Sequence, residues 1–301
     1  MKTNYILTYL CGYKQYVFDR FIGSLFDTDF KDKLVIFSKE ESTNKIKIWK
    51  EKYPENIIHI ICKPEYHPIT YRYKAYLDFL LELNDDVTGL IFLTDSKDVL
   101  FQKNIFNYDF KLIQKHKEDP IKDLYFFEED GFISECEINI AWLKNLFHDL
   151  GYNKKEIDGE LKRFFYKKTV CAGTTLGSYK GILTYLRVLN NNINNINIAK
   201  TQTVYGPDQA LHNIICHTDL LDNFIIENNL SPISVQNLDN NDGLVNNLVW
   251  GVMRETSFLS QDGYIHNKYG ETAFCLHLYD RISELSDKLM KFPQWSKYNL
   301  N

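Results

Sequence analysis

Residues 87–102 read VTGLIFLTDSKDVLFQ, and this stretch changes abruptly from apolar to acidic. Val87 to Leu93 is an almost unbroken apolar run around Gly89, and Asp95 and Asp98 follow it three residues apart. A continuous apolar run of this length predicts a strand that is buried on both faces of a sheet. The two carboxylates are then expected just beyond the carboxyl end of that strand.

Three further apolar segments of strand length precede this run, and helix-like segments separate them. The clearest helix is 70–83, in which Tyr73, Leu77, Leu80 and Leu81 share one face. Strands that alternate with helices predict a parallel sheet that is covered on both sides. The four strands are expected at 5–10, 33–38, 57–62 and 89–94.

The second half of the chain is less regular but contains the same two kinds of segment. The asparagine-rich stretch 190–197 is expected to be a loop or a helix end, and 228–250 is rich in loops. Strands are predicted at 123–129, 169–177 and 272–277, and helices at 138–151, 180–189 and 206–216. Because no linker or internal repeat appears, residues 1–301 are predicted to form a single α/β domain.

Composition excludes several classes of function. The net charge of −5 and the mixed acidic and basic residues argue against nucleic-acid binding. The six cysteines form no CxxC pair, which favours a reducing compartment over a disulfide framework. The apolar core from Tyr5 to Cys11 is too short for a signal sequence, and no segment reaches transmembrane length. A cytoplasmic protein without a membrane span is therefore expected.

The position of Asp95 and Asp98 suggests a ligand site. In open α/β sheets, ligands bind at the carboxyl ends of the strands. Two carboxylates at that edge suit a hard divalent cation, Mg²⁺ or Mn²⁺, which in turn neutralises a diphosphate. An ordinary polar turn, with Asp95 capping the next element, would give the same pattern.

Two predicted helix starts also carry charged residues. Arg72 lies in the first turn of the 70–83 helix, where the helix dipole disfavours a cation but an anionic ligand would attract one. A surface ion pair with Glu65 or Asp78 is the alternative. Asp208 lies at the start of the 206–216 helix, where it either caps the helix or takes part in chemistry.

Other signals are weaker or absent. His277 closes the 272–277 strand, either as a structural residue or as a third metal ligand. Gly173 and Gly177 in CAGTTLG would allow close approach of a ligand or form a bulge. The sequence contains no GxxxxGK[ST] loop, early GxGxxG, GxSxG or HExxH. P-loop NTPases, Rossmann dehydrogenases and the hydrolases that carry those motifs are thus disfavoured.

Taken in order, FLTDSKDVLFQ, CAGTTLG, GPDQALHN and HLYDR resemble the GT-A fold of nucleotide-sugar glycosyltransferases, from Tyr5 to Arg281. The resemblance implies a Rossmann-type α/β domain with a donor half, 1–110, and an acceptor half, 111–301. The chain departs from the family pattern at one point: Asp95 and Asp98 have DxxD spacing, where the family has DxD. The HxxGxxKPW ending of one retaining group is absent, so the chain is not assigned to that group.

The resemblance also implies roles for individual residues. Asp95, Asp98 and His277 would bind Mn²⁺ or Mg²⁺, and Asp208 would be catalytic beside the anomeric carbon of the donor sugar. The donor-binding residues would be Tyr9, Arg72, Asp95, Ser96, Lys97, Gly173, Thr174 and Gln209.

The implied reaction is transfer of a hexose or similar sugar from a nucleoside diphosphate sugar, UDP-linked, to an acceptor hydroxyl. Asp208 would stabilise the oxocarbenium-like transition state of a retaining reaction. An inverting reaction needs a base, for which Glu128, Glu129 and Asp130 are candidates. The alternatives are a nucleotidyltransferase that makes the sugar nucleotide and a catalytically silent carbohydrate-binding protein. The acceptor, whether glycan, protein or small molecule, and the oligomeric state stay open.

Overall fold

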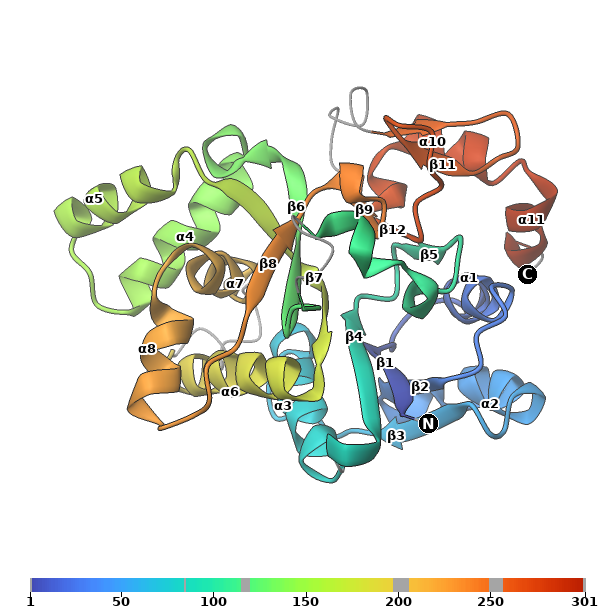
Figure 1. Ribbon diagram of the computed structural model, residues 1–301, viewed down its shortest axis with the longest axis horizontal. Coiled ribbons are helices and arrows are strands. Elements are labelled where there is room, and N and C mark those ends of the chain that lie inside the picture. The colour runs from blue at the N-terminus through green and yellow to red at the C-terminus, as the bar shows by residue number, and fades with distance from the viewer. Residues whose placement is uncertain (1, 84, 115–119, 197–205, 249–256, 300–301) are drawn as a thin grey trace.

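The apolar run that ends at Leu93 forms β4 (Thr88–Thr94), the central strand of the main sheet (Figure 1). The computed structural model describes residues 2–83, 85–114, 120–196, 206–248 and 257–299. Burial increases toward the carboxyl end of β4, where Ile91, Phe92 and Leu93 are almost completely buried. The strand therefore lies inside the molecule, as its continuous apolar sequence predicts.

The amino-terminal strands of the sheet are parallel. β1 (Thr3–Tyr9) pairs in parallel with both β2 (Lys33–Ser38) and β4, and β2 pairs in parallel with β3 (Ile57–Ile61). All four strands predicted for this half are confirmed close to their predicted bounds. Their carboxyl ends meet at one edge of the sheet.

On the other side of β4, one strand reverses direction. β7 (Lys168–Ser178) is antiparallel to β4 and to β6 (Leu124–Phe132), whereas β8 (Val235–Leu238) is parallel to β6. The described residues form a sheet in the order β3-β2-β1-β4-β7-β6-β8, which confirms the expected α/β fold with a mostly parallel central sheet. Because β7 is reversed, its middle and amino-terminal part border the edge at which β4 ends.

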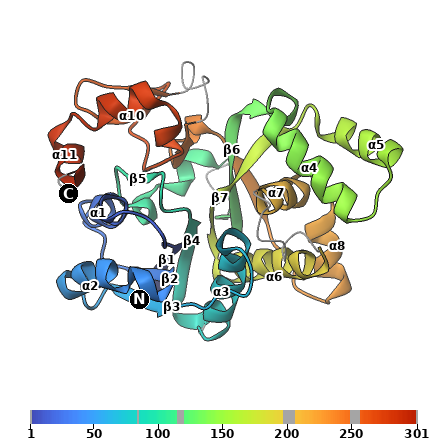
Figure 2. The same cartoon turned by 180° about the vertical axis from the view of Figure 1, so that it is seen from behind.

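Helices cover both faces of the sheet (Figures 1 and 2). Neighbouring residues of β1 point to opposite faces, so Ile6 packs with α1 and α2 while Leu7 packs with α3 and α6. The α-helices are α1 (Gln15–Phe26), α2 (Thr43–Lys52), α3 (Pro68–Leu81), α4 (Glu137–Asp149), α5 (Lys154–Phe164), α6 (Tyr179–Asn195), α7 (Pro207–His217), α8 (Leu220–Glu227), α10 (Ser283–Leu289) and α11 (Pro293–Ser296). Short 3₁₀ helices span Glu40–Ser42, Asp85–Val87, Ile105–Asn107, Phe110–Ile113, Ile133–Glu135, Asn240–Asp242, Tyr279–Arg281 and Lys297–Asn299.

A small second sheet joins distant parts of the chain beside the carboxyl end of β4. β12 (Cys275–His277) is antiparallel to β5 (Val99–Phe101) and parallel to β9 (Val245–Asn247). In this register His277 lies opposite Val99, the residue after Asp98. A hairpin of β10 (Ser257–Leu259) and β11 (Ile265–Asn267) lies beyond it. The late strand is thus confirmed, although it is shorter than the predicted 272–277.

The asparagine-rich segment forms the end of a helix, which is one of the two predicted alternatives. α6 continues to Asn195, beyond the predicted helix end at Leu189. The side-chain amides of Asn190 and Asn192 donate to the carbonyl oxygens of Leu186 and Val188, both at 2.8 Å. These asparagines therefore bond back onto their own helix and do not compete with it. Residue 197, the last of the segment, lies outside the described residues.

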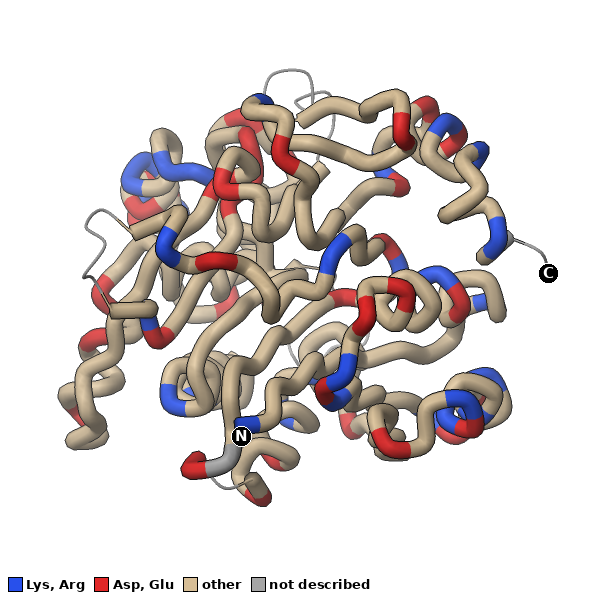
Figure 3. Tube along the Cα trace, turned by 45° about the vertical axis from the view of Figure 1, so that its right-hand side comes forward, with Lys and Arg blue, Asp and Glu red and all other residues tan. Residues whose placement is uncertain are grey.

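Acidic and basic residues are interspersed along the trace (Figure 3). In the part of the chain that the structure describes, no helix combines the length and the apolar character that crossing a bilayer requires.

Candidate active site

Asp95, Asp98 and His277 converge at the carboxyl end of β4. Each offers one ligand atom, and these atoms lie within 4.8 Å of one another. Nε2 of His277 is 3.5 Å from Oδ2 of Asp95 and 3.7 Å from Oδ1 of Asp98. The hydrogen bond from the backbone N–H of Asp95 to the carbonyl oxygen of Gly173, at 2.7 Å, holds the chain in place as it leaves β4.

The chemistry of this group suits a divalent cation. His277 and Asp98 are almost completely buried, and Asp95 is the most exposed of the three. Among the described residues Nε2 of His277 makes no hydrogen bond, although both carboxylates are at ion-pair distance. A buried polar atom without a partner is uncommon in folded proteins. Two carboxylate oxygens and one imidazole nitrogen form a donor set that Mn²⁺ accepts.

Gly173 of β7 has a packing reason to be glycine. A Cβ at this position would collide with Cε1 of His277 and lie 2.6 Å from its Nε2 and 2.9 Å from Oδ2 of Asp95. The strand can approach the acidic group this closely only without a side chain. This packing against His277 and Asp95 accounts for the glycine, and the predicted close approach of a ligand to Gly173 stays a prediction.

Arg72 connects the acidic group to Asp208. Its guanidinium contacts Oδ1 of Asp95 through Nη1, and its Nη2 is 3.1 Å from Oδ2 of Asp208. Nη2 also donates to the hydroxyl of Tyr73 at 2.8 Å. Arg72 is only 8% exposed, so a surface ion pair with Glu65 or Asp78 is excluded. The arginine and both aspartates are brought together as the sequence predicts.

Burial and charge set the protonation of the group. Burial raises the pKa of Asp98 and of Asp208. Burial also acts to raise the pKa of Asp95, but the nearby Arg72 guanidinium and His277 outweigh it and hold that pKa below its usual range. For His277 burial acts to lower the pKa, and Cys171, Asp95 and Asp98 raise it well above its usual range. Asp98, Asp208 and His277 therefore hold a proton more readily than the same groups in water.

The remaining donor-binding candidates lie around the same edge. Oγ of Ser96 donates to the carbonyl oxygen of Tyr9 at 3.2 Å, which ties the ends of β1 and β4 together. The hydroxyls of Tyr9 and Thr174 are buried and have no hydrogen-bond partner among the described residues. Nζ of Lys97 is 3.1 Å from Oδ2 of Asp280, with nearly half of the lysine side chain exposed.

Gln209 and Asp208 occupy the first turn of α7. The amide of Gln209 donates to the carbonyl oxygen of Val170 at 2.6 Å and accepts from the backbone N–H of Ala172 at 2.9 Å. Gln209 thus fastens α7 to β7, and its predicted contact with the donor stays a prediction. Asp208 is 3% exposed and pairs with Arg72, and it lies in the first turn of α7, where the helix dipole favours a carboxylate. The N-cap of this helix is Gly206, so Asp208 does not cap it.

Further residues at the site carried no role in the sequence prediction. Asn247 and Cys171 both contact Nδ1 of His277, at 2.8 Å and 3.4 Å respectively. Nη2 of Arg281 is 3.4 Å from Oδ2 of Asp98. Cys171 and Arg281 belong to the CAGTTLG and HLYDR segments, where no role was assigned to them, and no motif in the sequence marks Asn247. Glu129, a predicted base, lies near Cys171 and His277, and burial raises its pKa to about 7.

Two solved structures of the galactosyltransferase LgtC superpose on 98% of this chain. One, in complex with donor and acceptor sugar analogues, has a TM-score of 0.50 at 10% identity over 99% of its own length. The other, an active-site mutant in which glutamate replaces glutamine, has a TM-score of 0.50 at 12% identity over its full length. The chain has the GT-A fold of this galactosyltransferase. At these sequence identities the similarity shows the fold alone. The activity has to be inferred from the residues of the site.

Other comparisons add little. A 4-diphosphocytidyl-2C-methyl-D-erythritol synthase from Anaerococcus prevotii matches 79% of this chain and 89% of its own at 11% identity. Its TM-score of 0.43 is too low to favour either candidate function. No family model and no curated protein sequence matches the chain.

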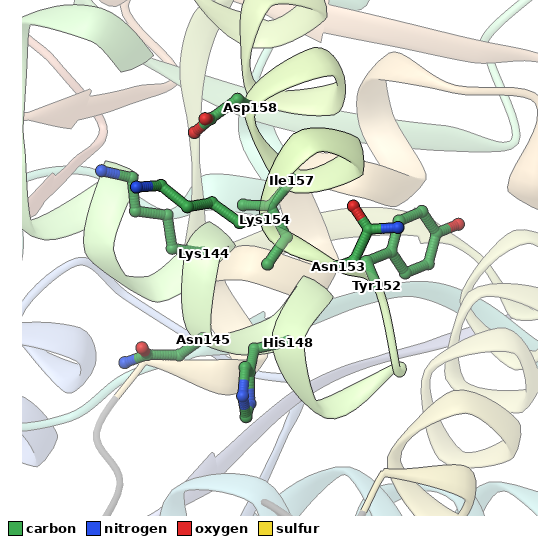
Figure 4. A pocket seen from close by; sticks show the side chains of 8 residues that line it. All are labelled: Lys144, Asn145, His148, Tyr152, Asn153, Lys154, Ile157 and Asp158. Carbon is green, nitrogen blue, oxygen red and sulfur yellow. The ribbon is translucent and has the colours of Figure 1, made fainter.

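A separate hollow of about 540 Å³ lies between α4 and α5 (Figure 4). It contains none of the predicted site residues. At the start of α5 the Asn153 side chain accepts from the backbone N–H groups of Lys155 and Glu156, so the helix end is already capped. The hollow is lined by Lys144, Asn145, His148, Tyr152, Asn153, Lys154, Ile157 and Asp158.

Proposed function

We propose that the protein is a divalent-metal-dependent glycosyltransferase that moves a sugar from a UDP-linked donor to an acceptor hydroxyl. The observation that carries the proposal is the convergence of Asp95, Asp98 and His277 at the carboxyl end of β4. The fold is shared with a galactosyltransferase whose structure was solved with donor and acceptor sugar analogues. A carboxylate-rich edge beside a parallel sheet is where such a donor would bind.

Asp95, Asp98 and His277 would hold Mn²⁺ or Mg²⁺. The cation, when bound, supplies positive charge against the diphosphate of the donor. Support comes from the buried Nε2 of His277 that makes no hydrogen bond, and from the absence of a side chain at Gly173, which leaves room at the group. Of the two ions, Mn²⁺ accepts an imidazole ligand more readily.

Lys97 and Arg281 are the cations best placed for the leaving diphosphate. Their side chains are 46% and 48% exposed, and both pair with Asp280 at the mouth of the group. Lys97 can turn toward an anionic ligand at small cost because its surface pair with Asp280 is weak, whereas Arg281 also contacts the buried Asp98. Arg72 is buried and forms ion pairs with Asp95 and Asp208, so its main role is to hold these carboxylates. Its Nε has no partner among the described residues and is the donor that could bind the ligand.

Asp208 is proposed as the catalytic carboxylate. Arg72 bridges Asp208 to Asp95, and this link supports a position of Asp208 beside the donor sugar. A carboxylate there stabilises an oxocarbenium-like transition state and suits a retaining reaction. An inverting reaction would use Glu129, because a carboxyl pKa near 7 suits a general base. The anomeric configuration of the product, read by NMR, distinguishes the two.

We assign the nucleotide end of the donor to residues 1–110 and the acceptor to 111–301. Tyr9, Ser96 and Thr174 line the edge at which β1, β4 and β7 meet, and the unpartnered hydroxyls of Tyr9 and Thr174 are available to a ligand. Gly173, Gln209 and His277 belong to the second half, so the site draws on both parts. A cytoplasmic location is proposed from the sequence alone.

The test is calorimetric titration of UDP and GDP with and without Mn²⁺, followed by incubation with UDP-sugars. A transferase releases UDP, whereas a nucleotidyltransferase supplied with pyrophosphate converts the UDP-sugar into UTP and the sugar 1-phosphate. A silent carbohydrate-binding protein shows no turnover at all. Failure of the folded protein to bind either nucleotide in the presence of Mn²⁺ would overturn the proposal.

A further inference from the structure

Asn247 is a buried asparagine in direct contact with His277. It ends β9 and lies opposite His277 in the parallel pairing with β12. Only 1% of Asn247 is exposed, and its Oδ1 is 2.8 Å from Nδ1 of His277. The Asn247 side chain therefore contacts Nδ1 of the ring, whereas Asp95 and Asp98 lie near Nε2.

The other end of the Asn247 amide fixes its orientation. Nδ2 donates to the carbonyl oxygens of Glu128, at 3.1 Å, and Phe127, at 3.4 Å. Carbonyl oxygens only accept hydrogen bonds, so the NH₂ group must face β6 and Oδ1 must face His277. A flipped amide would set oxygen against two oxygens. Because Oδ1 is an acceptor, Nδ1 of His277 carries a proton in this contact.

The proton on Nδ1 determines what Nε2 can do. A neutral imidazole with its proton on Nδ1 presents a lone pair at Nε2, and here Nε2 faces Asp95 and Asp98. Cys171 also lies near Nδ1, with its Sγ at 3.4 Å, but sulfur is a weak acceptor. Asn247 is therefore the stronger partner of Nδ1.

Asn247 is itself held firmly. Its backbone N–H donates to Oδ1 of Asn240 at 2.8 Å, and its carbonyl oxygen accepts from Nδ2 of Asn240 at 3.1 Å. The same Nδ2 donates to Asp130 at 2.9 Å. The pairing of β6 with β7 shifts register around Glu128, in the stretch whose carbonyl oxygens accept from Asn247. A side chain clamped at both ends can orient the ring that it contacts.

We propose that Asn247 is a positioning residue of the metal site: it holds His277 with the proton on Nδ1, so that Nε2 is directed at the cation. This inference rests on the metal-dependent function proposed above. Residues that contact the far nitrogen of a metal-binding histidine affect metal affinity about 10- to 100-fold.

The test compares Asn247→Ala and Asn247→Asp with Asn246→Ala. Asn246 is a matched control, because it is fully buried on the same strand but its Nδ2 donates to Oγ of Ser257, at 2.7 Å. Mn²⁺ affinity is measured by electron paramagnetic resonance without nucleotide, and the melting temperature is measured alongside. We expect Asn247→Ala to bind Mn²⁺ about 10- to 100-fold more weakly. Asn246→Ala is expected to melt lower yet bind Mn²⁺ like the wild type.

Asn247→Asp separates positioning from packing. The carboxylate keeps an acceptor for Nδ1 but loses the donor to the carbonyl oxygens of Phe127 and Glu128. The Asn247→Asp protein should therefore melt no higher than Asn247→Ala. It should nevertheless bind Mn²⁺ about tenfold more tightly than Asn247→Ala does. If affinity instead follows the melting temperature across the variants, or Asn247→Ala binds like the wild type, the positioning role is overturned. A wild type that does not bind Mn²⁺ overturns the metal site itself and this inference with it.

A second measurement covers an Asn247→Ala protein that does not fold. Nitrogen–proton correlation spectra of the histidine rings in the Mg²⁺-loaded wild type show which ring nitrogen of His277 carries the proton. A proton on Nδ1 supports the inference, and a proton on Nε2 overturns it.

Discussion

Asp98 and His277 come from distant parts of the chain, yet Nε2 of His277 lies 3.7 Å from Oδ1 of Asp98. If both bind one cation, Asp98→Asn and His277→Ala should each weaken Mn²⁺-dependent UDP binding. Each should also lower sugar transfer by on the order of a hundredfold or more, because the leaving diphosphate loses its counter-charge. Mn²⁺ titration, UDP-release assays and melting curves check this expectation.

Asp123→Asn provides the control for these two variants. Asp123 is a partly buried aspartate at the opposite edge of the sheet, where it accepts hydrogen bonds from Ser178 and Ser234. Its replacement should lower stability without changing Mn²⁺ affinity. A His277→Ala protein that melts lower but still binds Mn²⁺ and UDP normally would show that His277 is purely structural.

Gly173 allows a test that adds one methyl group to the site. Gly173→Ala would push its Cβ against Nε2 of His277 and Oδ2 of Asp95, so Mn²⁺ affinity should fall at least about tenfold. Gly159→Ala is the control, since Gly159 lies in α5 with open space around it and should stabilise that helix by about 0.5–1 kcal/mol. Equal Mn²⁺ affinity in the two variants would contradict a cation between these residues.

Single site residues could be predicted where a charged residue occurs at a position that its local secondary structure disfavours. Asp95 and Asp98 stand out because they follow an apolar strand. Arg72 stands out because the predicted helix start at residue 70 puts it in the first turn, but α3 begins at Pro68, so Arg72 lies in the second turn. Asn247 and Cys171 give no such signal, because their contacts with His277 are non-local. Asn247 meets His277 through the pairing of β9 with β12, and Cys171 reaches it from β7 of the main sheet. The roles assigned to Tyr9, Ser96, Thr174 and Gln209 came from the resemblance and stay predictions.

At the scale of elements, the start of α7 carries a testable constraint. Gly206 has a φ of 99°, and a Cβ there would overlap the ring of Trp142 in α4. Gly206→Ala should therefore destabilise the fold by at least about 2 kcal/mol more than Gly270→Ala. Gly270 has a φ of 81° with open space around it, so its replacement costs only the left-handed backbone. Urea unfolding measures both.

The same pair of variants also probes Asp208. If Trp142 holds the beginning of α7 in place, Gly206→Ala should displace Asp208 and lower sugar transfer even where the protein stays folded. Gly270→Ala should leave transfer unchanged. Equal unfolding free energies for the two variants would show that Trp142 can move aside.

Elements with a strong internal pattern were predictable, and elements defined by partners were not. β4 and α3 are encoded by long apolar runs and by a helical period, so their positions follow from local sequence. β5 and β9 have three residues each, too few for any periodicity, and they form strands because β12 pairs with both. The antiparallel direction of β7 likewise depends on its pairing with β4 and β6. It cannot be predicted from the residue pattern of β7 alone.

For the whole molecule, the site depends on topology. The candidate site combines the end of β4 with the reversed β7, the start of α7 and the short β12, and Figure 1 shows these elements around the middle of the molecule. An α/β class was readable from alternating strands and helices, but the meeting of Asp95, Asp208 and His277 was readable only through resemblance to a known fold. Pairing between strands that are distant in the sequence determines which residues meet, and the hydrophobic period of a single segment does not reveal that pairing.

The stability of the whole molecule should depend on pH through His212. This histidine is fully buried on α7, where the Tyr185 hydroxyl lies 2.5 Å from its Nδ1 and the Phe126 ring packs on it at 4.9 Å between centroids. Burial, with smaller contributions from His217 and Arg72, lowers its pKa to about 3. The unfolded chain therefore takes up a proton at His212 below about pH 6.5, and the folded chain does not.

The sign follows from this difference. Stability is complete above the unfolded pKa of about 6.5 and declines as the pH falls toward 3, by about 2 kcal/mol at pH 5. Other buried carboxyls titrate in the same range, so the wild type must be compared with His212→Gln, which has no ionisable ring. The variant should be less stable at pH 7, and its deficit should shrink by about 2 kcal/mol at pH 5. Between pH 8 and pH 7 the deficit should stay constant, because His212 is neutral in both states. Urea unfolding of the two metal-free proteins at each pH measures these values, and a deficit that does not change between pH 7 and pH 5 would contradict a buried neutral His212.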